Sequence, residues 1–179
     1  MLKIADIPAE VREVLAFPFD FSIDDIPDDP FWFTVTPALD LIPIAGEGTG
    51  GLYAQVASSG HILFTDSEGA GGIIADGLSD FIQLVVTHPY WRDLLKFSGG
   101  GNLAEMQRSV DWAAREYLEG YPETPKALRL IETSLGITPS SESLVRLHHS
   151  VSASPQILRL YAPDGTEFDS LFNRFTAPA

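Results

Sequence analysis

The chain has 179 residues, of which 45% are hydrophobic and 20% are charged, a composition that fits one globular domain. A chain of this length buries about 70% of the surface that its unfolded form exposes, so it needs no disulfide or metal for stability. Cysteine is absent, which excludes disulfides, zinc–thiolate sites and cysteine nucleophiles and fits a reducing compartment.

The charge of the chain is strongly acidic and unevenly distributed. Twenty-five Asp and Glu against eleven Lys and Arg give a formal net charge of −14. Such a protein repels phosphate backbones and anionic membranes, so we predict neither a nucleic-acid nor a membrane partner. Residues 1–98 carry fifteen acidic and four basic side chains, net −11, whereas residues 99–179 carry ten and seven, net −3. The asymmetry indicates either ordinary solubility or an N-terminal half that attracts a cationic partner.

The sequence contains no segment typical of export or membrane insertion. Residues 1–6 include no apolar run of signal-peptide length, and nowhere do about 18 apolar residues follow one another. The longest apolar stretches are interrupted by Asp, Gly or Pro within a few residues. We therefore expect a cytoplasmic protein.

The N-terminal part predicts a short helix followed by an acidic loop. Asp6 and Pro8 favour a helix start, because an acceptor at the cap and a proline in the first turn suit an N-terminus, and Pro18 ends the helix. The stretch 19–30 combines aspartates, aromatic residues and prolines. Prolines remove backbone donors and neighbouring aspartates repel one another, so we expect this loop to be exposed.

A β-hairpin is the clearest prediction for the middle of the chain. Residues 52–56 alternate apolar and more polar side chains, as a half-buried strand does. The turn 58–60 leads into a second strand at 61–65. A further short strand is expected at 72–75.

Helical periodicity dominates after Asp76, which can cap a helix with an apolar face from Leu78 to Val86. The stretch Ser98–Gly101 interrupts it and is a candidate hinge. Further helices are predicted over 102–120, 124–135 and 141–151, followed by a closing hairpin of 157–161 with 167–168.

These elements predict an α+β fold with a small central, mostly antiparallel sheet flanked by helices. The chain 1–179 is expected to form one domain. Its core spans about residues 1–98, and a helical extension, 99–179, ends in a β-hairpin.

The glycine-rich stretch Gly46–Gly51 is the first candidate for chemistry. A dinucleotide-binding fingerprint places its glycines between a strand and a helix, whereas this stretch leads into a strand. A phosphate-binding Walker loop needs Gly-Lys-Ser or Gly-Lys-Thr, which is absent, and Glu47 would repel a phosphate. We interpret the glycines as residues that permit positive φ and a close backbone approach where the loop enters the sheet.

A second candidate is a set of acids with one histidine: Glu47, His61, Asp66, Glu68 and Asp76. Their oxygens suit calcium or magnesium, but the EF-hand spacing is absent and His61 stands alone. His148 and His149 are adjacent on a helix and point about 100° apart, so they do not grip one ion together. We therefore predict no metal site and no cofactor.

Several segments resemble the SUKH superfamily, which includes the Smi/Knr-type cell-wall regulators of yeasts. The similar residues are Trp32, Ile42–Glu47, Gly50–Tyr53, His61–Phe64, Glu68–Gly69 and Ile74–Ile82. The resemblance covers about residues 30–98 and leaves 99–179 without a counterpart. It implies an α+β fold with a small central sheet. Bacterial members are similar to immunity proteins that neutralise polymorphic toxins, many of them nucleases, and no catalytic residue set is implied.

From charge and resemblance we expect a non-enzymatic protein-binding module, an immunity protein whose partner is a basic, nuclease-type toxin domain. A nuclease displays cations to hold its substrate, and an acidic surface competes for them. The expected partner surface consists of Asp24, Asp25, Asp28, Asp29, Glu47, Asp66 and Glu68, with Trp32 or Tyr53 as an aromatic anchor. The alternatives are a divalent-metal hydrolase that uses Glu47, His61, Asp66 and Glu68, and an intracellular regulatory scaffold without a toxin.

Overall fold

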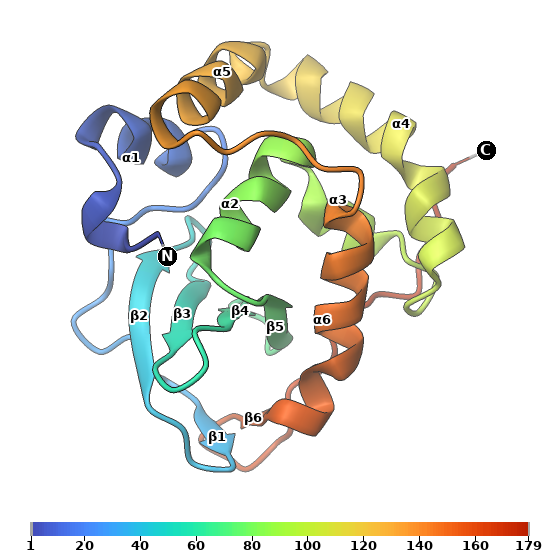
Figure 1. Ribbon diagram of the computed structural model, residues 1–179. Helices are drawn as coiled ribbons and strands as arrows, with labels where there is room; N and C mark the ends of the chain where they lie inside the picture. Colours follow the sequence, from blue (N-terminus) through green and yellow to red (C-terminus); the bar gives the residue numbers. More distant parts are fainter. Residues whose placement is uncertain (1, 179) are drawn as a thin grey trace.

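The computed structural model describes residues 2–178 and has an α+β fold, as predicted. Its helical segments are η1 (Ile4–Asp6), α1 (Ala9–Ala16), α2 (Leu78–Thr87), α3 (Trp91–Lys96), α4 (Leu103–Gly120), α5 (Thr124–Leu135) and α6 (Ser143–Ile157). Its strands are β1 (Thr34–Thr36), β2 (Leu41–Gly46), β3 (Leu52–Val56), β4 (Ile62–Thr65), β5 (Gly71–Ala75) and β6 (Arg159–Tyr161). Figure 1 shows α1, α5 and α4 as an arc around α2 and α3, with the strands on the opposite side.

The central sheet has the strand order β2-β3-β4-β5 and is antiparallel throughout. The predicted hairpin is confirmed, with Leu52 opposite Thr65 and Gln55 opposite Ile62. The predicted third strand is confirmed as β5, which pairs with β4. All of β4 is buried, because helices cover one face of the sheet and the β1–β6 pair covers the other.

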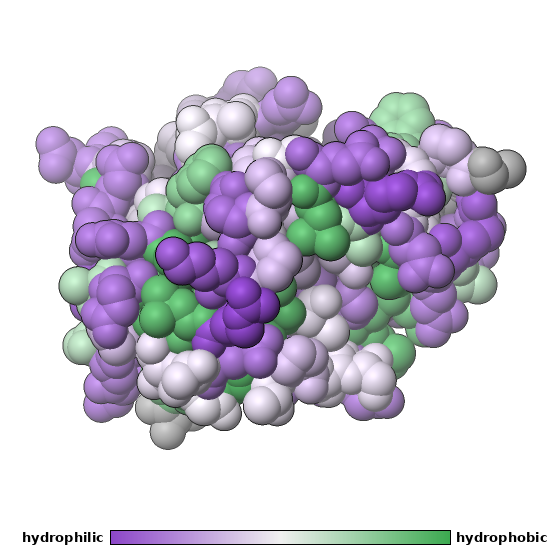
Figure 2. Space-filling model, turned by 90° about the horizontal axis from the view of Figure 1, so that it is seen from above, coloured by the Kyte–Doolittle hydropathy of each residue, from purple (hydrophilic) through white to green (hydrophobic). Residues whose placement is uncertain are grey.

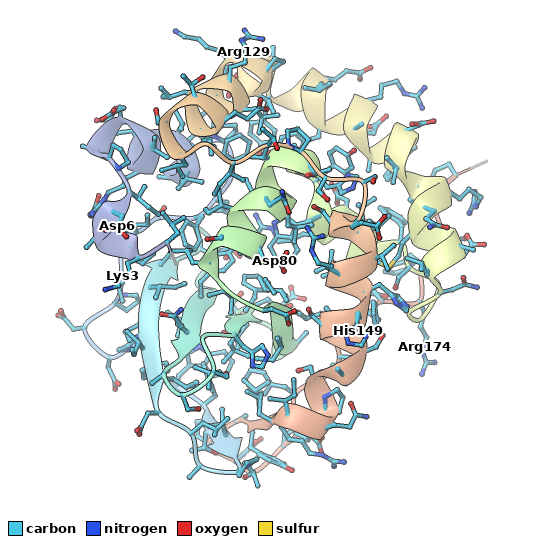
Figure 3. All side chains as sticks on the ribbon, in the orientation of Figure 1. Lys3, Asp6, Asp80, Arg129, His149 and Arg174 are labelled. Carbon is cyan, nitrogen blue, oxygen red and sulfur yellow. The ribbon has the colours of Figure 1, made fainter. Side chains whose placement is uncertain are left out.

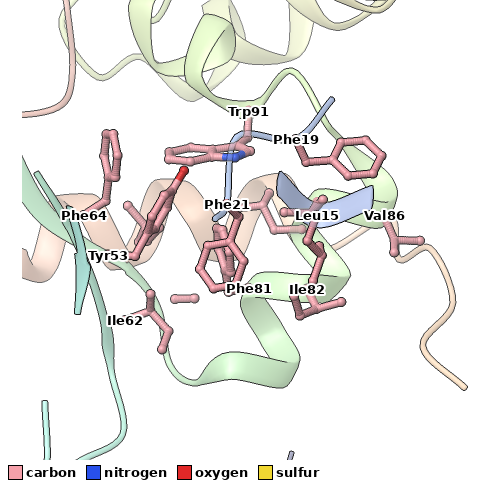
Figure 4. Packing of buried hydrophobic residues seen from close by; sticks show 14 of the residues in the cluster. Leu15, Phe19, Phe21, Tyr53, Ile62, Phe64, Phe81, Ile82, Val86 and Trp91 are labelled. Atoms are coloured by element: carbon pink, nitrogen blue, oxygen red, sulfur yellow. The ribbon is translucent and has the colours of Figure 1, made fainter. Parts of the chain in front are cut away.

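Alternation along β3 sends neighbouring side chains into two hydrophobic cores. Tyr53 lies on the helix side, where its ring contacts Phe21, Phe64 and Trp91, as Figure 4 shows. Leu52 lies on the other face, in the smaller cluster that β1 and β6 close. Aromatic rings in such edge-to-face and tilted contacts stabilise a core beyond the area that they bury.

The helical extension completes the helix-side core. Met106, Ala113, Ile131 and Leu147 are buried in the same hydrophobic cluster as Phe81 of α2. The face of α1, α4 and α5 that points away from the sheet is mainly hydrophilic, with apolar side chains in small separate groups (Figure 2).

The closing hairpin forms only in part. The turn 162–166 is present, and Tyr161 makes an isolated bridge with Glu167. The ladder of β6, however, is formed with β1, where Val35 lies opposite Leu160. This pairing brings both side chains into the smaller hydrophobic cluster over the central sheet, so apolar burial favours it over a longer C-terminal hairpin.

The candidate hinge 98–101 is a turn that the C-terminal segment holds in place. The N–H of Gly99 donates to the carbonyl of Phe175, and the N–H of Gly100 donates to that of Asn173, each at 2.8 Å. The three glycines have φ between 59° and 92°, a region that favours glycine. The stretch 98–101 is therefore a tight turn between α3 and α4 that is hydrogen-bonded to the C-terminal segment.

The two edges of the central sheet are covered differently. Helix α6 packs along β5, and the Oγ of Ser154 accepts the N–H of Ile73 at 2.9 Å (Figure 1). At the β2 edge, a backbone bridge joins Ser22 to Gly46, and a register shift lies beside Pro43. A proline removes a ladder donor and a bulge turns an edge away, and both disfavour addition of another strand.

Candidate functional site

An ionic cluster ties the glycine-rich loop to α3. Arg92 donates from Nη1 to Oε1 of Glu47 and from Nη2 to Oδ2 of Asp20, each at 2.7 Å. The other oxygen of Glu47 accepts the N–H and the hydroxyl of Thr49 at 2.9 and 2.6 Å and the N–H of Gly51 at 3.1 Å. Only 4% of the Glu47 side chain is exposed, so its charge is held by the protein.

The hydrogen bonds decide the protonation state of Glu47. Burial alone would raise the pKa of its carboxyl, but the bonds from Thr49, Arg92 and Gly51 outweigh burial and lower the pKa to about 2. Glu47 is therefore an anion at neutral pH, and its lone pairs are occupied by donors of the chain itself. Glu47 therefore holds the glycine-rich loop to α3, and its carboxylate has few free hydrogen-bonding positions for a ligand.

The glycines of this loop permit close backbone approach, as the sequence predicted. A Cβ at Gly46 would collide with the carbonyl oxygen of Asp25, and one at Gly51 would lie 2.6 Å from the carbonyl oxygen of Thr65. Gly50 has a φ of 99°. The stretch is a tight connection between β2 and β3, as expected for glycines that permit a close backbone approach at the entry to the sheet.

The loop predicted to be exposed, residues 19–30, is exposed only in its aspartate-rich part, residues 24–29 (the acidic loop), because Phe19, Phe21 and Ile23 turn into the hydrophobic core. Asp24, Asp25, Asp28 and Asp29 all lie at the surface. Asp24 pairs with Arg12 at 3.0 Å while 73% of its side chain stays in solvent. Within residues 2–178, the other three aspartates form no ion pair. Their mutual repulsion is uncompensated inside the chain, so a cationic group from outside would lower it.

An apolar groove of about 610 Å³ lies beside the acidic loop, on the helix-bearing face of β2 and β3. Its apolar lining consists of Leu2, Ile4, Ala5, Ile23, Ile26, Ile42, Pro43, Ile44 and Ala57. Ile42 leaves 49% of its surface in solvent. Ile23 and Ile26 flank Asp24 and Asp25 in the chain, so the loop forms part of the apolar wall and carries exposed aspartates next to it. Lys3 and Asp6 lie at the η1 end of β2 (Figure 3).

A second cavity, of about 370 Å³, lies on the α3 side of the molecule between the glycine-rich loop, the β4–β5 turn and the C-terminal segment. Glu47, Asp66 and Glu68 line it together with Arg92 and Lys96. The carboxylate of Asp66 accepts the N–H groups of Glu68 and Ala70 at 2.9 and 2.8 Å, which shapes the β4–β5 turn. These three acids are therefore brought together, but two of them are engaged by the chain itself.

Of the four residues of the alternative hydrolase, His61 lies apart from the other three. His61 lies next to the β3–β4 turn, with Nδ1 2.7 Å from Oγ of Ser59 and Nε2 3.7 Å from Oδ1 of Asp76, and it does not line the cavity of Glu47. Among residues 2–178 no three His, Cys, Asp or Glu side chains are placed to hold a metal ion.

Two residues of the expected partner surface lie inside the protein. Tyr53 is fully buried among aromatic rings, because the alternation of β3 turns it toward the helices. Glu47 is covered by Thr49 and Arg92. Neither belongs to an exposed surface, and this part of the expectation is wrong. Trp32 is 36% exposed and packs against Phe168 at 5.0 Å between ring centroids, outside the groove.

The groove is the feature that the sequence analysis missed. Its signal was present: Ile42, Pro43 and Ile44 form an apolar run with a proline, which is typical of an edge strand rather than a central one. The contribution of η1 could not be foreseen, because it depends on how the N-terminal turn packs on the sheet.

No family model, no curated protein and no solved structure matches the chain. Within residues 2–178, none of the helices has the length and apolar character needed to cross a membrane.

Proposed function

We propose that the chain is a non-enzymatic protein-binding module for a basic protein and that the acidic loop is its docking surface. The observation that carries the proposal is the exposure of four aspartates within six residues, of which only Asp24 is paired with a cation among residues 2–178. Clustered charge of one sign steers an oppositely charged partner and speeds encounter, more so at low salt.

The partner that suits this surface best is a nuclease-type toxin domain, which makes the chain an immunity protein. A nuclease carries cations at its substrate channel, and an acidic protein seated there competes with nucleic acid. The resemblance of residues 30–98 to SUKH proteins supports the same partner class. A regulatory scaffold would use the same surface with another basic partner.

The test compares two variants of equal net charge. Asp25, Asp28 and Asp29 are changed to Asn in one; the control changes the exposed acids Glu116, Glu119 and Glu123 of the α4–α5 region to Gln. Each is titrated by stopped flow with a purified nuclease-type toxin domain, taken from beside the gene where one is encoded there. We expect the association rate at about 0.01 M ionic strength to fall about tenfold in the loop variant and to change little in the control.

Equal slowing of both variants would mean that overall charge, and not the acidic loop, steers the partner. Failure of the wild-type chain to bind any basic domain, including an unrelated cationic nuclease used as a probe, would overturn the proposed function.

A further inference from the structure

The groove beside the acidic loop is a preformed apolar cavity on a protein surface. Its floor is rigid, since Ile23 and Ile44 are 6% and 4% exposed and belong to the hydrophobic core. Its mouth is apolar, since Ile42 is 49% exposed. The volume of about 610 Å³ lies within the range of cavities that hold a small ligand, which is room for more than one aliphatic side chain.

Arg12 holds the walls of the groove in position. Its Nε donates to the carbonyl of Ile7 at 3.0 Å, its Nη2 to that of Ile4 at 3.3 Å, and its Nη1 to Asp24 at 3.0 Å. One guanidinium therefore fixes η1, which carries Ile4, relative to the acidic loop. A groove whose walls are already ordered loses less entropy on binding.

The charges at the rim select the occupant. The two segments that wall the groove, residues 2–6 and 23–29, carry Asp6, Asp24, Asp25, Asp28 and Asp29 against Lys3, which lines the groove, and Arg12 bridges the two segments, so this region carries a net charge of −3 (two cations minus five aspartates). Anionic lipid and acidic peptides are repelled. A second copy of the chain, at net −14, is repelled as well. The complementary occupant is a basic protein segment with apolar side chains.

The edge of β2 limits how such a segment binds. Addition of a strand would need consecutive donors and acceptors along β2, but Pro43 has no N–H and a register shift follows it. The exposed half of Ile42 faces the groove on the sheet face. Side chains presented by a helix fit this geometry, with apolar residues entering the groove and lysines or arginines reaching the rim.

We infer that the groove lined by Ile23, Ile26, Ile42 and Ile44 is the anchor site for an amphipathic basic helix of the partner. This inference rests on the proposed function, since the same aspartates attract the partner. The acidic loop sets the rate of encounter, whereas the groove sets the lifetime of the complex, because apolar burial is insensitive to screening by salt.

The experiment uses three synthetic peptides of about 14 residues, long enough to form a helix on binding. One is an amphipathic Leu/Lys peptide, the second is oligolysine, and the third is a Leu/Glu peptide with the same pattern. Each is titrated into the full chain while backbone and isoleucine methyl resonances are followed by NMR. We expect the Leu/Lys peptide to shift the groove isoleucines and the loop aspartates, oligolysine to shift the aspartates alone, and the Leu/Glu peptide to leave both unchanged.

A pair of matched variants tests the anchor. Ile42→Ser removes an apolar side chain at the mouth of the groove, and Val145→Ser removes one that is 39% exposed on α6, away from the groove. Both sites are solvent-exposed, so both variants should fold. We expect Ile42→Ser to weaken binding of the Leu/Lys peptide about fivefold or more, through faster dissociation, and Val145→Ser to leave it unchanged.

The outcomes separate the two proposals. If both cationic peptides bind with equal affinity and shift only the aspartates, the groove is not the anchor, while the proposed function stands. If neither cationic peptide binds, the proposed function fails and the inference with it. If the Leu/Glu peptide binds as tightly as the Leu/Lys peptide, the inference that the occupant is basic is wrong. A dimer in sedimentation velocity that Ile42→Ser abolishes would assign the groove to a second copy of the chain.

Discussion

Two groups of carboxylates lie between residues 20 and 47 and have different surroundings in the fold. Asp20 and Glu47 meet Arg92 at 2.7 Å and are half-buried and buried. The aspartates of the acidic loop, 24–29, start only four residues after Asp20, and they point into solvent. The functional group is a carboxylate in both groups, so the difference comes from what the fold places beside each one.

A cation and backbone donors turn an acid into a structural element. Glu47 has an arginine, a threonine and a glycine N–H around it. Among the described residues 2–178, Asp25, Asp28 and Asp29 have no cation beside them, and their charge is directed outward. Structural acids should be sensitive to mutation and pH, whereas the outward ones should affect binding only.

The largest expected effect comes from removing the cation of the ionic cluster. Arg92→Met leaves Glu47 buried without its counter-ion, and we expect a loss of about 2–3 kcal/mol in the free energy of unfolding. This is less than the ~3–5 kcal/mol for breaking a fully buried pair, because the Arg92 side chain is 38% exposed and partly screened. Urea unfolding followed by tryptophan fluorescence measures the change.

Arg159→Met is the matched control, because its ion pair with Glu167 spans 3.5 Å between side chains that are 55% and 48% exposed. Its stability should change by at most about 0.5 kcal/mol. Equal losses in both variants would show that the ionic cluster is no more structural than a surface pair.

The second effect is a pH dependence that belongs to Glu47. Its pKa in the folded chain is lowered to about 2 from the ordinary value of 4.5, so the carboxylate stabilises the fold above about pH 4.5. As the pH falls from there toward 2, the unfolded chain takes up the proton first and this stabilisation is lost.

We expect Glu47→Gln to cost about 1–2 kcal/mol near pH 7, and the gap to the wild type to narrow as the pH falls below about 4.5. Urea unfolding of both proteins from about pH 7 down to about pH 3 measures this. A gap that stays constant over this range would show that the charge of Glu47 is not what stabilises the loop.

The parts of the fold that depend on local sequence could be predicted. The β3–β4 hairpin follows from alternation and a turn. Asn102 caps α4 by accepting the N–H groups of Ala104 and Glu105, and Gly136 ends α5 with a φ of 65°, as their residue types indicate. These features need only neighbours in the chain.

The features that depend on distant contacts could not be predicted. β1 finds its partner β6 more than 120 residues later, at Arg159–Tyr161, and no local pattern specifies that choice. Arg92 reaches Asp20 and Glu47 across 72 and 45 residues. Tyr53 and Trp32 are both aromatic anchors by type, and only the packing of the sheet shows that the first is core and the second half-exposed.

The smallest expected effect is on the stability of the acidic loop variant. Changing Asp25, Asp28 and Asp29 to Asn removes three charges that have no ion-pair partner within residues 2–178, so the free energy of unfolding should change by no more than about 0.5 kcal/mol. The midpoint and slope of urea unfolding measure this.

A loss above about 1 kcal/mol would show that these aspartates also support the fold, since surface substitutions without a structural partner rarely cost that much. An unchanged midpoint, together with slower binding of a basic partner, would separate the two groups of carboxylates fully. The ionic cluster would then account for the stability of the fold and the acidic loop for the rate of partner binding, because each property responds to a different set of substitutions.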